Sequence, residues 1–358
     1  MSILRSSGLA FALLCAAATT SFGQAGGAAV PFVMIAPDAR ASGMGEVGTA
    51  IADDINAVFW NPAGLGFQTD MQQVSLSFSK WLPQFNADLF YSYGTYGQYV
   101  PELDGTIAGT FIFMNLGEFT RTAIDGTELG KFRSNEFALG VSYGTMLSKD
   151  VAAGVQIKYI QSNLAPAGGQ QASAGTGISA AFDVGFLWKP TKLDVFGADL
   201  DNRLSLGVNL QNVGPKMTYL NESDPLPTQL RMGAAVKLVE DEFSDLLISV
   251  DVAKLLVRRD SLGSDAIPMS FVTAWGVGGL ETGVGLEYIY DQAVALRGGY
   301  FTEPKAAGAR NFFTLGAGVT YDVFRLDFSY ILTVEDNHPL ANTLRFSLIV
   351  DWQQEANN

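Results

Sequence analysis

The last hydrophobic run of the chain, residues 343–352, alternates strictly between two kinds of position. The apolar row consists of Leu344, Phe346, Leu348, Val350 and Trp352. The other row, which is mainly polar, consists of Thr343, Arg345, Ser347, Ile349 and Asp351. Successive side chains of a β-strand point to opposite faces, so the run predicts a strand with two unlike faces. A strand that faces lipid on one side and a watery lumen on the other explains both rows.

The same alternation returns along most of the chain, in short runs separated by Gly, Pro, Asn, Asp or Ser. The clearest runs are 74–80, 89–96, 106–116, 137–147, 151–161, 178–188, 203–213, 229–239, 246–257, 283–290, 294–301, 313–321, 326–334 and 344–352. An even number of strands is typical of single-chain outer-membrane barrels, whose closed sheet satisfies every backbone group in lipid. The sequence therefore predicts an all-β protein, an antiparallel transmembrane β-barrel of about 14 strands over residues 71–353.

The two ends of the chain do not alternate. Residues 1–5 are a short positively charged start and residues 8–18 are apolar. With small residues just before Gln24, residues 1–23 are expected to be a secretory signal peptide, too short to span a bilayer. The single cysteine, Cys15, lies inside it, so the mature chain is expected to have no disulfide and no cysteine-ligated metal. Residues 354–358 are expected to be a short tail.

Residues 24–70 form a separate segment ahead of the predicted barrel. Residues 49–60 have helical character, and Asn and Pro then start a new turn that Gly64 ends. The simplest role for such a segment is to plug the lumen as a hatch. We expect its central residues to be buried against the inner wall or in the segment's own core: Phe59, Trp60, Asn61, Pro62 and Leu65.

Connection lengths predict the orientation of the barrel. Short connections at 148–150, 290–293 and 322–325 are typical of periplasmic turns. Longer ones are expected on the extracellular side, at 117–135, 162–177, 214–227 and 302–311. Residues 260–279 interrupt the strand rhythm, and we favour an amphipathic segment at the barrel rim over a fifteenth strand.

Composition narrows the class of protein. Only 16% of the residues are charged and the mean hydropathy is +0.18, which is too apolar for a disordered chain. After Gln24 no run of about 18 apolar residues occurs, so helical membrane spans are excluded. The net charge of −14 argues against nucleic acid as a partner. The expected location is the outer membrane, in contact with membrane lipids.

No motif points to catalysis. Residues 43–48 match G-x-G-x-x-G, but this fingerprint binds dinucleotides only between a buried strand and a helix. We interpret its glycines as tight packing of the hatch against the wall. His338, the single histidine, is expected to be an exposed loop residue. Inward-facing charges are expected to form a structural network: Glu287, Arg297, Asp327 and Arg345. We expect no enzyme, no cofactor and no metal.

Several blocks of the sequence resemble known outer-membrane proteins. Ala52-Asp53-Asp54 and the run Phe59-Trp60-Asn61-Pro62-Ala63-Gly64-Leu65 are similar to the amino-terminal hatch of FadL-type proteins. With five further blocks, the chain resembles the PorV/PorQ family of Bacteroidetes-type bacteria over nearly its whole mature length: residues 37–45, 287–288, 296–301, 326–330 and 338–348. Gly64 stands where many PorV-like sequences have Lys, so a divergent PorV and a PorQ-like relative both stay open.

The resemblance implies a FadL-like barrel of the type IX secretion system. Such proteins receive secreted proteins by their carboxy-terminal signal domain at the outer-membrane translocon and pass them to a sortase-containing attachment complex. Because rigid scaffolds place recognition groups on loops, we expect loop 214–227 to contact this cargo through Met217, Tyr219 and Leu220.

Two rival functions remain. A FadL-like transporter of hydrophobic solutes would need a continuous apolar tunnel, whereas the inward rows are rich in Gly, Ser, Thr, Asn and Arg. An enzyme such as a lipid A deacylase would need a nucleophile and a base that the sequence does not reveal.

Overall fold

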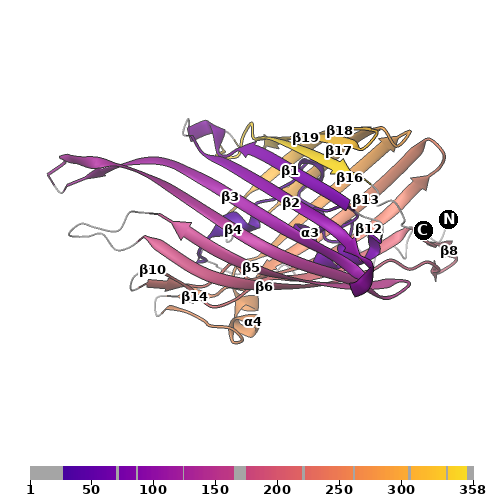
Figure 1. Ribbon diagram of the computed structural model, residues 1–358, viewed down its shortest axis with the longest axis horizontal. Coiled ribbons are helices and arrows are strands. Elements are labelled where there is room, and N and C mark those ends of the chain that lie inside the picture. Colours follow the sequence, from indigo (N-terminus) through magenta and orange to yellow (C-terminus); the bar gives the residue numbers. More distant parts are fainter. Residues whose placement is uncertain are drawn as a thin grey trace.

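Fourteen antiparallel strands close into one barrel, in which each strand pairs with its neighbours along the chain and β1 pairs with β20 (Figure 1). This computed structural model describes residues 27–69, 72–85, 88–123, 125–164, 175–219, 222–260, 263–304, 308–335 and 338–352. The wall strands are β1 (Gln72–Lys80), β2 (Phe90–Val100), β3 (Gly105–Thr122), β4 (Glu128–Ser148), β5 (Val151–Asn163), β6 (Thr176–Trp188), β9 (Leu204–Val213), β12 (Gln229–Glu240), β13 (Ser244–Leu255), β16 (Leu280–Tyr290), β17 (Val294–Thr302), β18 (Asn311–Tyr321), β19 (Phe324–Thr333) and β20 (Leu344–Asp351). The predicted fold class and all fourteen predicted strands are confirmed. The predicted signal peptide and tail lie outside the described residues.

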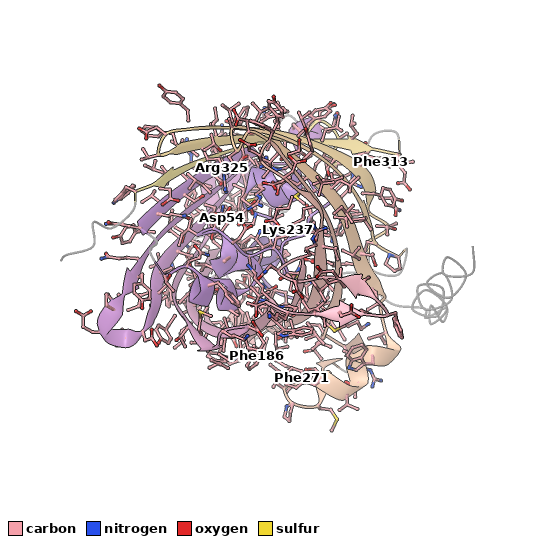
Figure 2. All side chains as sticks on the ribbon, turned by 90° about the vertical axis from the view of Figure 1, so that its right-hand side faces the viewer. Asp54, Phe186, Lys237, Phe271, Phe313 and Arg325 are labelled. Atoms are coloured by element: carbon pink, nitrogen blue, oxygen red, sulfur yellow. The ribbon has the colours of Figure 1, made fainter. Side chains whose placement is uncertain are left out.

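Side chains of the wall sort by parity, as the alternation predicts. In β20 exposure changes residue by residue, with Leu348 exposed on the outer face and Ser347 buried inside. In Figure 2, which looks into one end of the barrel, Phe313 lies on the outer wall and Arg325 lies within the ring of strands. A wall that is apolar outside and polar inside is the arrangement that crosses a membrane.

The inner row of side chains is polar, but it contacts protein rather than water where the amino-terminal part of the chain passes. The Ser347 hydroxyl accepts a hydrogen bond from the Ala39 N–H at 2.8 Å and lies 2.7 Å from the Ser77 hydroxyl. The expectation of a watery lumen is therefore wrong at this level of the barrel, because protein groups take the place of water.

The two ends of the barrel differ in their connections. At one end, here called the turn end, wall strands are joined by residues 101–104, 149–150, 189–203, 241–243, 291–293 and 322–323. The other end, the loop end, carries the remaining and generally longer connections (Figure 1). Short turns face the periplasm in bacterial outer-membrane barrels, so we expect the turn end to be periplasmic and the loop end to be extracellular.

One predicted loop is mostly strand. β3 and β4 leave only residues 123–127 between them, so residues 117–135 belong mostly to the outer end of a hairpin that projects past the other strands (Figure 1). The rings of Phe119 and Phe132 stack across this hairpin with centroids 5.7 Å apart. Such cross-strand contacts keep two strands paired beyond the wall. The prediction that residues 117–135 are a long connection between strands was therefore wrong here.

Short elements decorate both ends of the barrel. At the loop end they are η3 (Pro83–Phe85), β10 (Met217–Tyr219), β11 (Glu222–Asp224), β14 (Arg259–Asp260), β15 (Gly263–Ser264), α4 (Ser270–Thr273) and η5 (Ala274–Gly276), and at the turn end η4 (Pro101–Leu103), β7 (Asp194–Val195) and β8 (Ala198–Asp199). The described residues of 260–279 thus form a rim segment, as predicted, and add no strand to the wall.

Residues 27–68, here called the lumenal segment, run inside the barrel (Figure 1). Its helical turns are η1 (Pro31–Met34), α2 (Ala39–Ser42), α3 (Ala57–Trp60) and η2 (Pro62–Phe67). α2 packs on β18, β19 and β20, whereas η2 packs on β3, β4, β5 and β6, so the segment bridges distant parts of the wall. Among the described residues, no helix combines the length and apolar character needed to cross a membrane.

The orientation of β20 predicts the cost of charge on its outer row. Leu348→Arg, near the middle of the strand, should destabilise the barrel by about 2–4 kcal/mol, and Leu344→Arg, at its extracellular end, by about 0–1 kcal/mol. Equilibrium unfolding by urea in lipid vesicles measures both, with Leu348→Ala as the control for lost volume. Equal costs for the two Arg variants would contradict the membrane placement of the strand.

Candidate functional site

A belt of glycines lines the inner wall where the lumenal segment crosses it. A Cβ added to Gly154 would lie 2.2 Å from the carbonyl carbon of Pro62, and one added to Gly299 would lie 2.2 Å from the backbone nitrogen of Gly45. Side chains at these positions would exclude the segment, because such distances are far inside van der Waals contact. This glycine belt comprises Gly144, Gly154, Gly185, Gly207, Gly233, Gly283, Gly285, Gly299 and Gly316.

Two glycines of the lumenal segment meet this wall in turn. A Cβ on Gly43 would lie 2.9 Å from the Gly316 Cα, and one on Gly45 would lie 2.7 Å from the Val284 carbonyl oxygen. Gly45 also adopts a left-handed backbone with φ of 74°. The interpretation of the G-x-G-x-x-G match as packing against the wall is therefore confirmed for Gly43 and Gly45, whereas Gly48 packs on the Trp60 ring of the segment itself.

Asn61 fastens the segment to the wall. Its side-chain amide donates hydrogen bonds to the carbonyls of Thr49 and Phe186, each at 3.0 Å. Its Oδ1 accepts the Ala63 N–H at 3.2 Å and so caps the first turn of η2. One side chain thus links two parts of the segment to β6.

The other central residues of the predicted hatch are buried nearby. Phe59, Trp60 and Leu65 are only 9%, 3% and 0% exposed. From β9, the Asn209 and Gln211 side chains donate hydrogen bonds to the carbonyls of Trp60 and Phe59, at 2.9 and 2.5 Å. These carbonyls would otherwise be buried without a donor. The predicted burial is confirmed, and pore closure by these residues stays a prediction.

Asp251 on β13 supplies a carboxylate within the glycine belt. One of its oxygens accepts the N–H groups of Gly48 and Thr49, each at 3.0 Å, and the Thr49 hydroxyl at 2.6 Å. The Arg231 guanidinium lies 3.5 Å from the same oxygen. Three donors and a neighbouring cation offset the cost of burying this charge.

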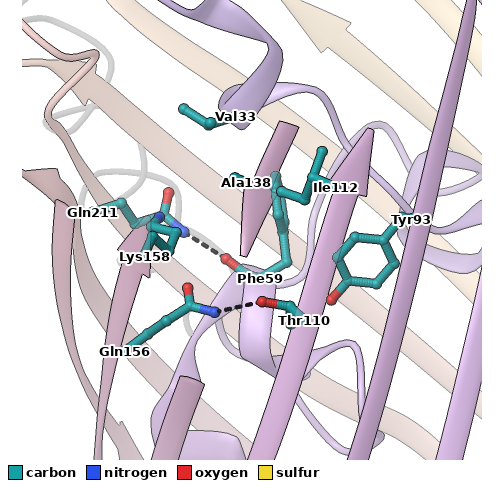
Figure 3. Close-up of a pocket in the computed structure, with 9 residues that line it drawn as sticks. All are labelled: Val33, Phe59, Tyr93, Thr110, Ile112, Ala138, Gln156, Lys158 and Gln211. Atoms are coloured by element: carbon teal, nitrogen blue, oxygen red, sulfur yellow. Dashed lines mark hydrogen bonds between the residues drawn. The ribbon is translucent and has the colours of Figure 1, made fainter. Parts of the chain in front are cut away.

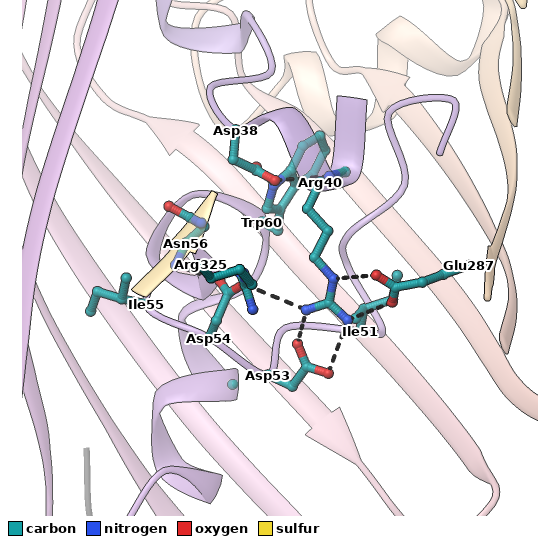
Figure 4. Close-up of polar contacts among 12 residues, drawn as sticks. Asp38, Arg40, Ile51, Asp53, Asp54, Ile55, Asn56, Trp60, Glu287 and Arg325 are labelled. Atoms are coloured by element: carbon teal, nitrogen blue, oxygen red, sulfur yellow. Dashed lines mark hydrogen bonds and ion pairs between the residues drawn. The ribbon is translucent and has the colours of Figure 1, made fainter. Parts of the chain in front are cut away.

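Toward the turn end, charges from the segment and the wall form one network (Figure 4). This lumenal ion cluster comprises Arg40, Asp53, Asp54, Glu287, Arg297, Arg325 and Asp327. Arg40 binds Glu287 in a bidentate manner, at 2.7 and 2.9 Å, and also pairs with Asp53. Bidentate guanidinium–carboxylate pairs are among the strongest in proteins.

On the wall side of the lumenal ion cluster, Arg297 bridges Glu287 at 2.8 Å and Asp327 at 2.7 Å. The predicted charge network is therefore confirmed for these three residues. Arg345 lies outside it and pairs instead with Glu46 of the lumenal segment, at 3.5 Å.

Two buried carboxylates of the segment have displaced pKa values. Burial raises the pKa of Asp54, but the nearby Arg325 and Arg40 outweigh this and hold it below its usual range. Burial, with the Asp54 charge, raises the pKa of Asp38, although Ala41 N–H and Trp60 Nε1 donate to its carboxylate. The contribution of Asp54 to stability is thus complete above the usual Asp pKa and is lost as pH falls through the lowered value.

Toward the loop end, apolar side chains fill the lumen. Phe59 and Tyr93 meet edge to face with ring centroids 6.5 Å apart, and Val33 and Ile112 line the same small cavity (Figure 3). That cavity measures about 10 Å³, about the smallest space that holds one water molecule. In the described part of the chain, this apolar cluster is therefore packed rather than hollow.

Loop 214–227 folds back onto the same apolar cluster. Met217 and Leu226 are buried in it, Tyr219 packs against it half-buried, and the Ala29 N–H donates to the Pro225 carbonyl at 2.9 Å. Met217 thus anchors the loop from beneath. Leu220 lies outside the described residues, and the cargo contact assigned to this loop stays a prediction.

A groove of about 270 Å³ opens beside this loop. Apolar side chains such as Leu226, Leu256 and Ile267 line it together with Lys216, whose ammonium donates to the Ser264 carbonyl at 2.6 Å. The groove therefore lies between loop 214–227 and the rim segment, at the loop end.

Among the described residues, the side chains able to ligate a metal ion are dispersed. They include no group of three His, Cys, Asp or Glu side chains arranged to hold one. His338 is half-buried rather than exposed, and its Nδ1 accepts the Leu340 N–H at 3.1 Å. The expectation of an exposed histidine was wrong, because the short turn after it bends back onto the ring.

Sequence reasoning missed the wall side of the interface. The glycine belt, Asp251 and Arg231 were not singled out, and the partners of Arg40 were not foreseen. A signal was present, since glycine recurs on the inward row of strand after strand, as at Gly154 and Gly207. Its meaning depends on strand register, which parity alone does not fix.

Comparison with a family model identifies the chain's relatives. The model for type IX secretion system protein PorV matches residues 20–261. No curated protein matches the chain.

Solved structures of the same fold include two toluene transporters. TbuX of Ralstonia pickettii is 10% identical, with a TM-score of 0.53 over 88% of this chain and 98% of that one. TodX of Pseudomonas putida is 12% identical, with a TM-score of 0.53 over 89% of this chain and 99% of that one. At such low identity the likeness establishes the FadL-type fold alone.

The glycine belt predicts a contrast between two neighbouring residues. Gly299→Ala should destabilise the protein by about 1–3 kcal/mol, since its methyl group would enter the backbone of the lumenal segment. Gly298→Ala is the matched control, because its Cβ would have only the Thr314 carbonyl, 4.0 Å away. Urea unfolding and protease cleavage within residues 27–68 report the effect. Equal losses would refute the close-contact role of the belt.

The lumenal ion cluster predicts a second contrast. Arg40→Gln leaves the buried Glu287 short of a partner and should cost about 3–5 kcal/mol. Lys131→Gln removes an exposed ion pair with Glu118 and should cost about 0–1 kcal/mol. Thermal unfolding of both variants in the same detergent tests this, and comparable stability of the two would count against the cluster.

Proposed function

The chain belongs to the family of type IX secretion system protein PorV, an outer-membrane barrel of the FadL-like fold, and from this premise we propose that it is a non-enzymatic cargo shuttle. It receives secreted proteins by their carboxy-terminal signal domain at the outer-membrane translocon. It then passes them to the sortase-containing attachment complex on the cell surface.

The observation that carries this proposal is that the loop end offers an open surface, whereas the apolar cluster inside the barrel is packed. The loop end combines the β3–β4 hairpin, loop 214–227 and a groove of about 270 Å³, all on the extracellular side. Loops on a rigid scaffold are the usual place for recognition groups. A folded signal domain needs such a surface and needs no passage through the barrel.

The packing of the apolar cluster inside the barrel weighs against a transporter of hydrophobic solutes. Ligand sites measure about 300–1,000 Å³, whereas the cavity in the apolar cluster measures about 10 Å³. Transport would require the lumenal segment to leave its contacts with the glycine belt and the lumenal ion cluster. We therefore propose that this segment is a hatch that stays closed.

The cargo role predicts a loss of capture without a loss of folding. Replacing residues 219–222 by Asn-Gly removes Tyr219 and Leu220 but keeps the Thr218–Ser223 pair and the buried Met217. Cargo capture in mild detergent should fall at least about tenfold, as for loss of an aromatic hot spot. Replacing residues 291–293, at the turn end, by Asn-Gly is the control and should leave capture unchanged.

A variant with all four long connections trimmed separates the two functions. Surface delivery that stays intact after the extracellular connections at 117–135, 162–177, 214–227 and 302–311 are all trimmed would reject the shuttle. Altered uptake of a hydrophobic solute in those cells would instead favour the transporter.

The hatch role predicts a silent pore. In planar lipid bilayers the wild-type protein should give no steady large conductance. The double variant Arg40→Gln, Gly299→Ala should give frequent openings, because both changes weaken the seat of the lumenal segment while the wall strands are kept. A wild-type protein with a large steady conductance would overturn this part of the proposal.

A further inference from the structure

The connection between β6 and β9 is unlike the others at the turn end. Residues 189–203 join these strands, whereas residues 101–104, 149–150, 241–243, 291–293 and 322–323 make the remaining turns. The long connection builds its own two-stranded hairpin from β7 and β8, which stands beyond the wall beside the β8 label in Figure 1. Two or three residues are enough to join antiparallel strands, so this length has to be explained by something else.

Phe196 occupies the tip of this hairpin. Its side chain is fully exposed, and its backbone is left-handed with φ of 55°. The next residue, Gly197, has φ of 83°, so the tip is a turn with two left-handed residues, stabilised by the Gly197 N–H donating to Asp194 at 2.9 Å. Asn or Gly suits the first such position, whereas a bulky aromatic is disfavoured there. Neither the turn nor the packing of the barrel therefore accounts for this phenylalanine.

An exposed aromatic ring on a stiff arm has the form of an anchor. Phe buries a large apolar area when it enters a pocket, and it is held here by few rotatable bonds. The base of the arm is fixed as well: the Lys189 N–H donates to the Asp150 carbonyl at 2.8 Å, and the Leu193 N–H donates to Asp201 at 2.6 Å. Binding would therefore cost little conformational entropy in the arm.

Charge at the turn end selects the kind of partner. The six connections there carry ten acidic residues against four basic ones: Glu102, Asp104, Asp150, Asp194, Asp199, Asp201, Asp241, Glu242, Asp291 and Asp322, against Lys149, Lys189, Lys192 and Arg203. Asp194 and Asp199 are cross-strand partners just behind Phe196. Negative charge around an apolar tip disfavours insertion among anionic lipids and favours a protein surface with Lys or Arg around a pocket.

We propose that the β7–β8 hairpin is a periplasmic docking arm whose Phe196 enters an apolar pocket, bordered by basic residues, on a periplasmic protein. This interaction is distinct from the proposed cargo contacts at the loop end. The base of this arm lies next to the lumenal segment, since the Lys189 ammonium approaches the Ile51 carbonyl at 3.4 Å and the Phe67 ring centroid at 5.1 Å.

The test uses the full chain in its native outer membrane, with the photo-crosslinker benzoylphenylalanine at position 196. The matched control carries it at Gln292, another exposed left-handed residue at the turn end, with φ of 54°. We expect a discrete protein adduct from position 196 and none from position 292. Equal adducts at the two positions, none at either, or lipid adducts at 196 would overturn the proposal.

Binding of the identified protein, purified, then decides whether the tip and its charges drive the contact. Phe196→Asn suits the turn and cannot fail by misfolding it, and it should weaken binding at least about tenfold. Asp194→Asn with Asp199→Asn keeps the acceptor oxygens, removes both charges and should weaken binding more at low than at high salt. Unchanged binding by Phe196→Asn would overturn the proposal.

A second measurement addresses the membrane directly. In vesicles of phosphatidylethanolamine and phosphatidylglycerol with brominated chains, Phe196→Trp should show no more quenching than the wild type. Strong additional quenching would assign the arm to the bilayer and overturn the protein partner.

Discussion

The rest of the structure depends on a contact of backbone against backbone. It joins the lumenal segment to the inner wall at the glycine belt, where the wall residues have no side chains. Gly154 and Gly299 lie on distant strands of the wall, yet each leaves room for the main chain of the segment and for nothing more. A barrel of fourteen strands is too wide to be filled by its own side chains, so something else must occupy it. The glycine belt lets a short chain with only helical turns reach the wall on several sides at once.

Such contact leaves main-chain groups of the segment far from water, and the polar residues around the belt satisfy them. Asn61, Asn209 and Asp251 each bond to backbone atoms of the segment rather than to one another. The lumenal ion cluster adds charge pairs that are costly to bury but more costly to break singly. Its role is therefore better described as fixing one position of the segment than as adding net stability.

The sequence predicted the wall well and the inside poorly, for a physical reason. A strand in a membrane barrel is set by its own alternation, which is local, so all fourteen strands and the outward placement of Leu348 followed from parity. The expected burial of Phe59, Trp60 and Leu65 followed from their apolar character. What Arg40 or Asp251 contacts depends on partners more than two hundred residues away in the sequence. The β3–β4 hairpin was misjudged as a loop, because its cross-strand aromatic pair is recognisable only once register is known.

The lumenal segment also touches connections at both ends of the barrel. Ala29 bonds to Pro225 in loop 214–227, and Lys189, at the base of the β7–β8 hairpin, approaches Ile51 and Phe67. A partner at either end can move the segment only by the difference between its affinities for the seated and displaced states. Displacement would break the ion pairs of Arg40 and open gaps along the glycine belt together, so this difference would have to be large. A partner that binds the seated state instead gains a rigid surface without that cost. The packing inside the barrel thus favours a fixed platform with recognition at its ends over a gate that opens during each cycle.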